Sequence, residues 1–191
     1  FQPGTGWFIV AMNYFPGTTT RYGLDFYLAF FTFKRKMVPG TFTQIYLQFV
    51  IAVKFREARL TTNHQKEVFS FISGLINSMG HRSYAINGMP DHVHIFMSFS
   101  PSHSPSETIK EIKRASTNFI NEKGWFGRKF QWQNGYGCFS YSRSQIDDVV
   151  KYILNQQKHH SKRSFREEYL EFLRRFEVEF NEQFLFEFFD D

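Results

Sequence analysis

The sequence predicts an α+β protein in which helices cover an antiparallel, ferredoxin-like sheet. Segments rich in β-branched and aromatic residues alternate along the chain with segments whose apolar residues recur at helical spacing. Two strand-like segments, residues 81–88 and 92–99, lie on either side of a Gly-Met-Pro-Asp turn, which predicts a hairpin and hence antiparallel pairing. Strands interleaved with helices and joined in part by a hairpin indicate helices packed on one sheet, and the ferredoxin-like arrangement is the nearest fit.

The elements can be assigned in chain order. Residues 43–55 predict the first strand, because they combine β-branched and aromatic side chains in one long run. Residues 63–80 predict an amphipathic helix that begins at an Asn63 cap, and residues 104–124 predict a second helix behind a serine cap. Later segments predict an aromatic strand, a helix with a Ser144 cap and a final helix. These are residues 129–142, 144–160 and 164–180.

The length and composition fit one domain. With 191 residues, 42% of them hydrophobic, the chain can build one substantial core. Residues 1–36 are rich in glycine, threonine and aromatic residues but lack helical or strand periodicity. We therefore assign them to an N-terminal extension that is poorly organised or lies upstream of the true domain. Organised sequence begins near Met37, and we assign residues 37–191 to the single domain.

Charge and cysteine content narrow the partners and the compartment. The net charge of +5 fits a nucleic-acid partner without demanding one. A single cysteine, Cys138, excludes an internal disulfide framework and a cysteine-based zinc site, which favours the reducing cytoplasm. The apolar run at 26–33 is far shorter than the roughly 20 residues that span a bilayer. Basic residues follow this run rather than precede it, so we expect neither export nor a membrane partner.

His92 and His94 are the first candidates for a functional site. Residues i and i+2 of a strand share a face, so both imidazoles could bind one divalent cation while Val93 points to the opposite face. A pair of histidines on a solvated strand face is the plain alternative. Two histidines leave a metal ion underligated, so the functional interpretation requires a further ligand and a reactive group elsewhere in the chain.

Tyr152 and Gln156 offer that reactive group and that ligand. They are four residues apart in the predicted 144–160 helix and therefore share one face. A phenol beside an amide oxygen suits metal-assisted attack on phosphorus. Asp or Glu ligates hard metals more often than Gln, however, and a tyrosine packed on a buried helix face is the alternative. Tyr136 and Tyr141 rank lower, because aromatic residues in a strand more often stack or pack.

Three neighbouring residues are lesser candidates. His159 and His160 fall roughly on the helical face of Tyr152 and could join the site, or could be solvated residues at the negative end of the helix. Asp91 could orient the histidine pair through a hydrogen bond, or could simply belong to the turn.

Six residues are candidates for DNA contact. Three cations recur on neighbouring turns of the second predicted helix and could neutralise phosphates, although Glu107 and Glu111 could equally balance them on a solvated face. Basic and aromatic residues then interleave in the manner of proteins that bind single strands. The candidates are Lys110, Lys113, Arg114, Arg128, Lys129 and Trp132.

In this order, the motifs resemble the single-tyrosine HUH transposases, the insertion-sequence-200-like group that includes the REP-associated tyrosine transposases. The resemblance rests on the sequence HVH at 92–94 after Gly-Met-Pro-Asp, on the basic helix, on the aromatic strand FQWQNGYGCFSYS, and on the late helix with Tyr152 and Gln156. It runs from about Thr41 to the C-terminus.

The resemblance implies a metal-dependent transposase that cleaves and rejoins single-stranded DNA. Tyr152 would attack a phosphodiester to form a 5'-phosphotyrosine intermediate, with His92, His94 and Gln156 holding Mg²⁺ or Mn²⁺ at the scissile phosphate. The resemblance also implies DNA with hairpin ends and a homodimer. Its composite active sites would join the histidines of one subunit to the tyrosine helix of the other.

Two other functions stay open at this point. One is a domesticated relative that binds hairpins or single-stranded DNA without mobilising it. The other is a metal-dependent phosphodiesterase in which water attacks instead of tyrosine. The presence of all four residues, His92, His94, Tyr152 and Gln156, favours the transposase over the first, and a trapped protein–DNA adduct would exclude the second.

Overall fold

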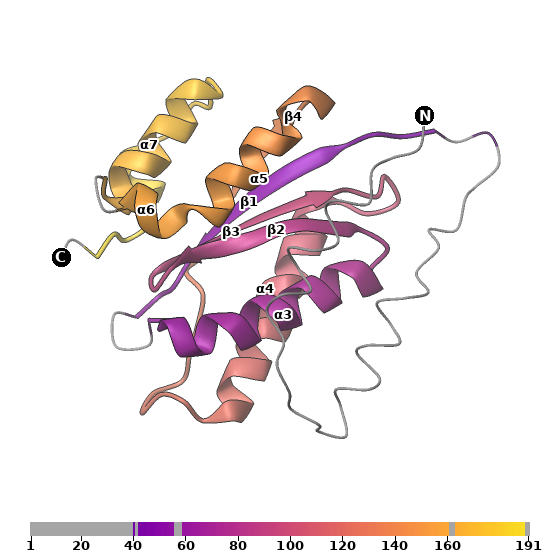
Figure 1. Ribbon diagram of the computed structural model, residues 1–191. Helices are drawn as coiled ribbons and strands as arrows, with labels where there is room; N and C mark the ends of the chain where they lie inside the picture. The colour runs from indigo at the N-terminus through magenta and orange to yellow at the C-terminus, as the bar shows by residue number, and fades with distance from the viewer. Residues whose placement is uncertain (1–39, 41, 56–58, 161–162, 190–191) are drawn as a thin grey trace. The chain divides into compact units, whose positions relative to one another are not determined.

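The computed structural model describes residues 40, 42–55, 59–160 and 163–189 (Figure 1). The predicted extension, residues 1–36, lies outside these residues, so its assignment stays a prediction.

The described part contains a four-stranded sheet. Its strands are β1 (Tyr46–Ala52), β2 (Arg82–Met89), β3 (His92–Ser98) and β4 (Gly137–Tyr141). They lie in the order β2-β3-β1-β4, and every neighbouring pair is antiparallel. One helix connects β1 to β2 across β3, and another connects β3 to β4 across β1. This is the ferredoxin-like arrangement, so the predicted fold class is confirmed.

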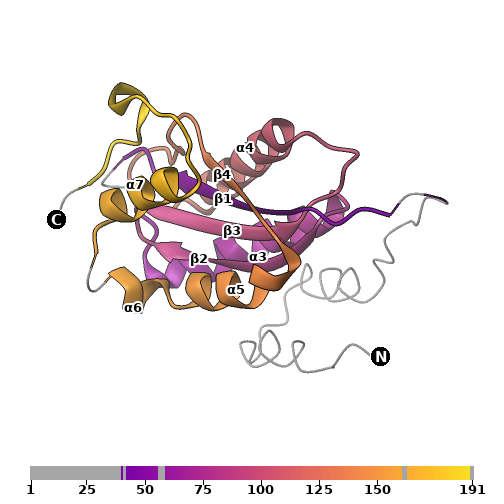
Figure 2. The same ribbon diagram turned by 90° about the horizontal axis from the view of Figure 1, so that it is seen from above.

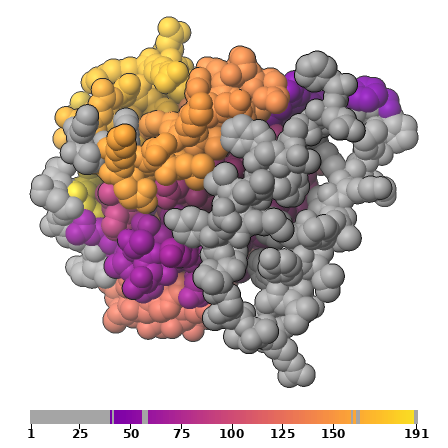
Figure 3. Space-filling model, in the orientation of Figure 1, coloured from indigo at the N-terminus to yellow at the C-terminus, as the bar shows by residue number. Residues whose placement is uncertain are grey.

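Helices cover both faces of the sheet. They are α3 (Thr62–Ser78), α4 (Pro105–Lys123), α5 (Ile146–Leu154), α6 (Gln156–His160) and α7 (Phe165–Arg175), with short 3-10 turns η3 (Arg143–Gln145) and η4 (Glu182–Phe184). In Figure 1, α3 and α4 lie below the sheet and α5 to α7 lie above it, and the same division shows on the surface in Figure 3. Figure 2 shows α5 and α6 running along β2. None of the described helices is both long and apolar enough to cross a membrane.

The helix ends agree only in part with the sequence prediction. Ser104 caps α4 by accepting a hydrogen bond from the backbone of Glu107, and Gly124 ends the helix in the left-handed conformation, with φ of 65°. The cap of α3 was placed wrongly at Asn63, because the helix already begins after Thr61.

The predicted helix over 144–160 is interrupted. Its first turn begins at Ser142, whose backbone N–H and hydroxyl donate to the Gln145 side chain, rather than at Ser144. The helix then breaks at Asn155, between α5 and α6. The predicted aromatic strand is also shorter than expected. Only residues 137–141 form β4, while Trp132 pairs with Val53 in an isolated bridge.

The two central strands are buried on both faces. All seven residues of β1 are buried, as expected for a strand between two helical layers. Toward α3 and α4 the strands present only apolar side chains, among them Phe49, Ile51, Val93 and Ile95. Toward α5 and α7, the buried residues of the same strands include the polar side chains of Gln48, His92 and His94. The candidate functional site lies on this second face.

Candidate active site

The histidine pair lies on β3, on the face covered by α7. His92 and His94 are both 0% exposed, and their ring centroids are 5.2 Å apart. Val93 points to the other face and packs in the core with α3 and α4. The alternation of side chains predicted from the sequence is therefore present, and the burial excludes a solvated histidine pair.

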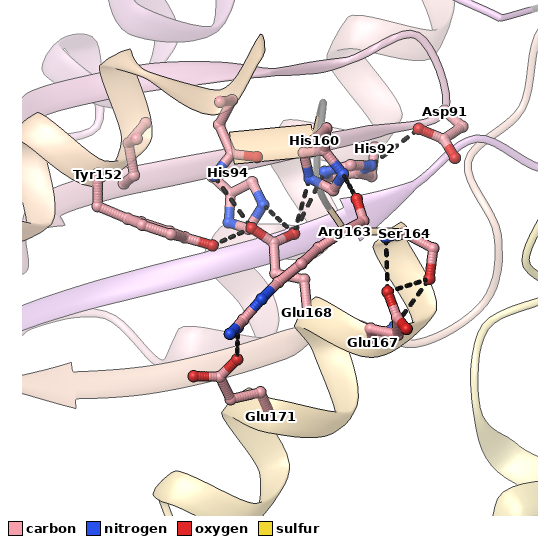
Figure 4. Close-up of polar contacts among 12 residues, drawn as sticks. Asp91, His92, His94, Tyr152, His160, Arg163, Ser164, Glu167, Glu168 and Glu171 are labelled. Carbon is pink, nitrogen blue, oxygen red and sulfur yellow. Dashed lines mark hydrogen bonds and ion pairs between the residues drawn. The ribbon is translucent and has the colours of Figure 1, made fainter. Parts of the chain in front are cut away.

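Glu168 of α7 reaches both histidines (Figure 4). Its Oε2 atom lies 3.3 Å from Nε2 of His94 and 3.5 Å from Nε2 of His92, and the side chain is 3% exposed. The Glu167 side chain accepts a hydrogen bond from the backbone N–H of Ser164 and fixes the start of α7. Phe165, in the first turn, stacks on the His92 ring with centroids 3.9 Å apart. Aromatic packing thus holds the carboxylate against the histidines.

Sequence reasoning missed Glu168. The available signal was its position on the apolar stripe of the last helix, which is formed by Phe165, Tyr169 and Phe172 at spacings of three, four and seven residues. A carboxylate on a buried stripe requires polar partners, because burying an unpaired charge is costly. This pattern marks a functional candidate even without a known motif.

Tyr152 and Gln156 meet at the same carboxylate. The Tyr152 hydroxyl donates a hydrogen bond to Oε1 of Glu168, and Nε2 of Gln156 donates to that oxygen at 3.1 Å. The helix break at Asn155 separates the two residues into α5 and α6, yet both side chains reach one point. The predicted proximity of Tyr152 and Gln156 is therefore present.

The second nitrogen of each histidine is also engaged. Nδ1 of His92 donates to Oδ1 of Asp91 at 2.8 Å, and Nδ1 of His94 lies 2.8 Å from Nε2 of Gln48. Gln48 in turn accepts a hydrogen bond from the Tyr141 hydroxyl at 2.8 Å. Burial is the largest single effect on Asp91 and opposes its ionisation, but the hydrogen bond to His92 and the other nearby groups together outweigh it and lower the pKa of the carboxyl. Asp91 and Gln48 thus turn both Nε2 atoms toward Glu168.

His160 joins this cluster from the end of α6. Its Nε2 atom lies 3.1 Å from Oε2 of Glu168, and Nδ1 lies 3.0 Å from the carbonyl oxygen of Arg163. Its ring centroid is 4.7 Å from that of His92. Of the two open interpretations of His160, the structure supports a place in the site. The side chain of His159 is outside the described residues.

The donor set fits a divalent cation. Ligand atoms of His92, His94 and Glu168 all lie within 4.8 Å of one another in a buried position. Nε2 of His92 and Oε1 of Gln156 are buried without a hydrogen-bond partner among the described residues. Burial lowers the pKa of His94 despite the nearby Glu168 carboxylate, so the ring is neutral at pH 7, the form that binds metals. These residues could hold a metal ion through imidazole nitrogen and side-chain oxygen.

Comparison with known families identifies the chain. The profile of the family described as "Transposase IS200 like" matches residues 41–156, more than half of the sequence. The chain belongs to the IS200-like transposase family. No curated protein sequence gives a significant match to this transposase.

Two solved structures are similar to this transposase. One, from Deinococcus radiodurans R1, is described as a candidate transposase. It is 21% identical, with a TM-score of 0.50, over 63% of this chain and 97% of the other. The second is a REP-associated tyrosine transposase bound to a REP hairpin. It is 16% identical, with a TM-score of 0.48, over 65% of this chain and 74% of the other. The first of these likenesses supports the fold.

The predicted DNA-contact residues of this transposase lie on α4 and in the segment after it. Because α4 covers the opposite face of the sheet, the structure does not gather these residues around Tyr152. Lys110, Arg128 and Lys129 are exposed, and the Arg128 guanidinium lies 3.6 Å from the Phe55 ring centroid. They remain candidates for phosphate contact.

The other predicted DNA contacts are already engaged within the chain. Nζ of Lys113 donates to the carbonyl oxygens of Gln133 and Gly135, and burial lowers the pKa of this lysine. Arg114 is exposed but pairs with Glu111. Trp132 is 6% exposed, and its indole N–H donates to Ser116, so this ring packs in the core instead of offering a face to a base.

A cleft gives access to the tyrosine. It lies between α5 and α7, has a volume of about 270 Å³, and reaches Tyr152 and Glu168. Aromatic side chains of Tyr141 and Phe172 line it, together with Arg175 near the end of α7. The Tyr152 side chain is therefore accessible from this side, away from the core under the opposite face of the sheet.

Proposed function

We propose that this transposase cleaves and rejoins single-stranded DNA, with Tyr152 as the nucleophile. The observation that carries the proposal is the convergence of the Tyr152 hydroxyl on the buried His92, His94 and Glu168 cluster. A phenol directed at a candidate metal site is the arrangement that nucleophilic attack on a phosphodiester requires.

In the proposed reaction the Tyr152 oxygen forms a bond to phosphorus, and the bond from phosphorus to the 3'-oxygen of the strand breaks. The products are a 5'-phosphotyrosine and a free 3'-hydroxyl. Rejoining is the reverse, in which a 3'-hydroxyl attacks the phosphotyrosine and releases Tyr152. The covalent link conserves the energy of the phosphodiester, so strand exchange needs no nucleotide cofactor.

His92 and His94 would hold Mg²⁺ or Mn²⁺, with side-chain oxygens of Glu168 and Gln156 completing the set. A bound cation would polarise the phosphate and stabilise the charge that develops on it. The Gln48 side-chain nitrogen, which donates, faces Nδ1 of His94, so the proton of the neutral ring is on Nε2. To bind a metal ion through Nε2, His94 would need its proton on Nδ1 instead. The Gln48 amide would then be rotated so that its oxygen faces Nδ1.

The proposed substrate is an unpaired strand, beside a hairpin. The exposed cations Lys110, Arg128 and Lys129 support contact with phosphates, so affinity should fall as salt rises. The test incubates the protein and Mn²⁺ with 3'-labelled single-stranded or duplex DNA. The 3' fragment should become covalently attached to protein only from the single strand. Equal cutting of a blunt, perfect duplex would refute the proposed substrate.

A homodimer with composite sites is the arrangement that the family resemblance implies. One chain, however, already brings Tyr152 to its own histidines, which supports activity within one subunit. Mixing Tyr152→Phe with His92→Ala subunits separates these arrangements. Composite sites should regain about one working site per mixed dimer, whereas sites within one chain should regain none once subunit exchange is verified.

Two observations bear on the alternatives. The contact between Tyr152 and Glu168 favours tyrosine over water as the nucleophile. The buried, complete cluster also favours a catalytic protein over a domesticated DNA-binding relative, because a pure binding role gives no reason to bury two histidines and a carboxylate together.

The cytoplasmic location is still an expectation, based on the single cysteine.

A further inference from the structure

The attacking tyrosine must lose a proton. A free tyrosine has a pKa of about 10, so at neutral pH it is a phenol and a poor nucleophile. The bond from its oxygen to phosphorus can form only as the hydroxyl proton leaves. A group already in hydrogen-bond contact with the hydroxyl is the natural acceptor.

Glu168 is in that position. Oε1 of its carboxylate accepts the hydrogen bond from the Tyr152 hydroxyl. The imidazoles of His94 and His160 face the other oxygen, Oε2, at 3.3 and 3.1 Å. The two oxygens of one buried carboxylate thus face different partners: Oε1 faces the nucleophile, and Oε2 faces the histidine cluster (Figure 4).

The orientation of the carboxylate is fixed from several sides. Gln156 donates to Oε1 at 3.1 Å, and α7 is held against the sheet by Phe165 and Phe172, which pack with His92 and His94. Glu168 also lies beyond residues 41–156, the part that the family profile matches. The last helix therefore contributes a group to the site that the matched region does not contain.

We propose that Glu168 is a catalytic residue that accepts the Tyr152 proton, an inference that rests on the proposed function. As the Tyr152 oxygen bonds to phosphorus, its O–H bond breaks and the proton passes to Oε1 of Glu168. The phosphorus to 3'-oxygen bond breaks, and the 3'-oxygen takes a proton from water. A carboxylate suffices because the phenolic proton becomes far more acidic once its oxygen bonds to phosphorus. On rejoining, Glu168 returns the proton to Tyr152.

The test compares Glu168→Gln with Glu168→Asp under single turnover. Gln keeps the shape and a hydrogen-bond acceptor but cannot take the proton, while Asp keeps the carboxylate and shortens its reach. At saturating DNA and Mn²⁺, we expect Glu168→Gln to form the covalent adduct about 10²- to 10⁴-fold more slowly than wild type. Glu168→Asp should be faster than Glu168→Gln. A Gln variant as fast as the Asp variant, or near wild type, overturns the proposal.

Two further measurements separate catalysis from metal loading and folding. Mn²⁺ titration and DNA affinity, measured directly, show whether a slower rate reflects lost binding. Glu67→Gln is the control, since Glu67 is an exposed glutamate on α3, on the opposite face of the sheet, and pairs with Lys123, and it should stay within about two-fold of wild type. If Glu168→Gln does not fold, the equal-length pair Glu168→Asp and Glu168→Asn repeats the comparison, with Asp at least about ten-fold faster.

Failure of this inference differs from failure of the proposed function. If wild type forms no adduct, or if Tyr152→Phe forms one, the proposed nucleophile is wrong. If wild type forms the adduct, Tyr152→Phe does not, and Glu168→Gln reacts as fast as Glu168→Asp, only the role of Glu168 is overturned.

Discussion

The two faces of the sheet bury the same strands in different ways. Toward α3 and α4, β3 presents Val93 and Ile95 to an apolar core. Toward α7, the neighbouring residues His92 and His94 are equally inaccessible but contact polar side chains. One strand, through the simple alternation of its side chains, thus contributes stability on one face and chemistry on the other.

The polar face can be buried because its groups are paired. Gln48, His94, Glu168 and Tyr152 form a connected set of contacts from β1 through β3 to α7 and α5. Such pairing offsets part of the cost of removing polar groups from water, but an apolar core would serve stability as well or better. We therefore predict that substitutions on the polar face mainly lower activity, whereas substitutions on the apolar face mainly lower stability.

The largest effect on activity is expected at the histidines. His92→Ala or His94→Ala should abolish DNA cleavage, because each removes a nitrogen ligand from the candidate metal site. Folding and most DNA affinity should persist, since phosphate contacts elsewhere carry binding. Cleavage assays, Mn²⁺ titration and thermal unfolding of each variant test this. Full activity of the wild type in excess chelator would contradict the metal assignment.

The residue next to His94 should behave in the opposite way. Ile95→Ala removes a fully buried side chain from the apolar face and should lower the free energy of unfolding by about 2–5 kcal/mol. The site itself is untouched, so the rate of adduct formation should stay within about three-fold of wild type below the unfolding temperature. Denaturant unfolding and the adduct assay measure the two quantities. A large loss of activity in a folded Ile95→Ala protein would show that the faces are not separable.

A smaller effect is expected at Gln48, which contacts His94 but not the proposed substrate. Gln48→Leu removes the partner that orients the imidazole and should weaken Mn²⁺ binding by about 10- to 100-fold. Gln65→Leu is the matched control, because Gln65 is another buried glutamine whose amide bonds the Leu60 carbonyl on the α3 side. Unchanged Mn²⁺ affinity in Gln48→Leu would mean that the hydrogen bond to His94 does not tune the site.

The apolar face could be predicted from the sequence more fully than the contacts that build the polar face. The spacing of apolar residues was sufficient to predict the strands of the sheet and the helices α3 and α4, because that spacing lies within each segment of the sequence. Spacing made His92, His94, Tyr152 and Gln156 candidates, and the family resemblance implied their roles, which stay predictions. Glu168 was missed, because its role depends on how α7 docks against the sheet, which no local pattern records.

Two of the residues predicted to contact DNA have another role within the fold, where local pattern and tertiary use diverge. An aromatic residue between basic ones can stack on a base or fill a core, and Trp132 fills the core. A lysine on a charged helix can bind phosphate or backbone carbonyls, and Lys113 binds the carbonyls of Gln133 and Gly135. Asn155 likewise ends α5 in a way that helical periodicity does not reveal.

The most direct test of the central claim is covalent capture with wild type and Tyr152→Phe in parallel. Each protein is incubated with Mn²⁺ and 3'-labelled single-stranded DNA and separated under denaturing conditions. Wild type should carry label that moves with the protein, and Tyr152→Phe, which lacks only the attacking oxygen, should bind DNA and Mn²⁺ normally but carry none. Labelled adduct on Tyr152→Phe, or cleavage by wild type without any adduct, would contradict the account.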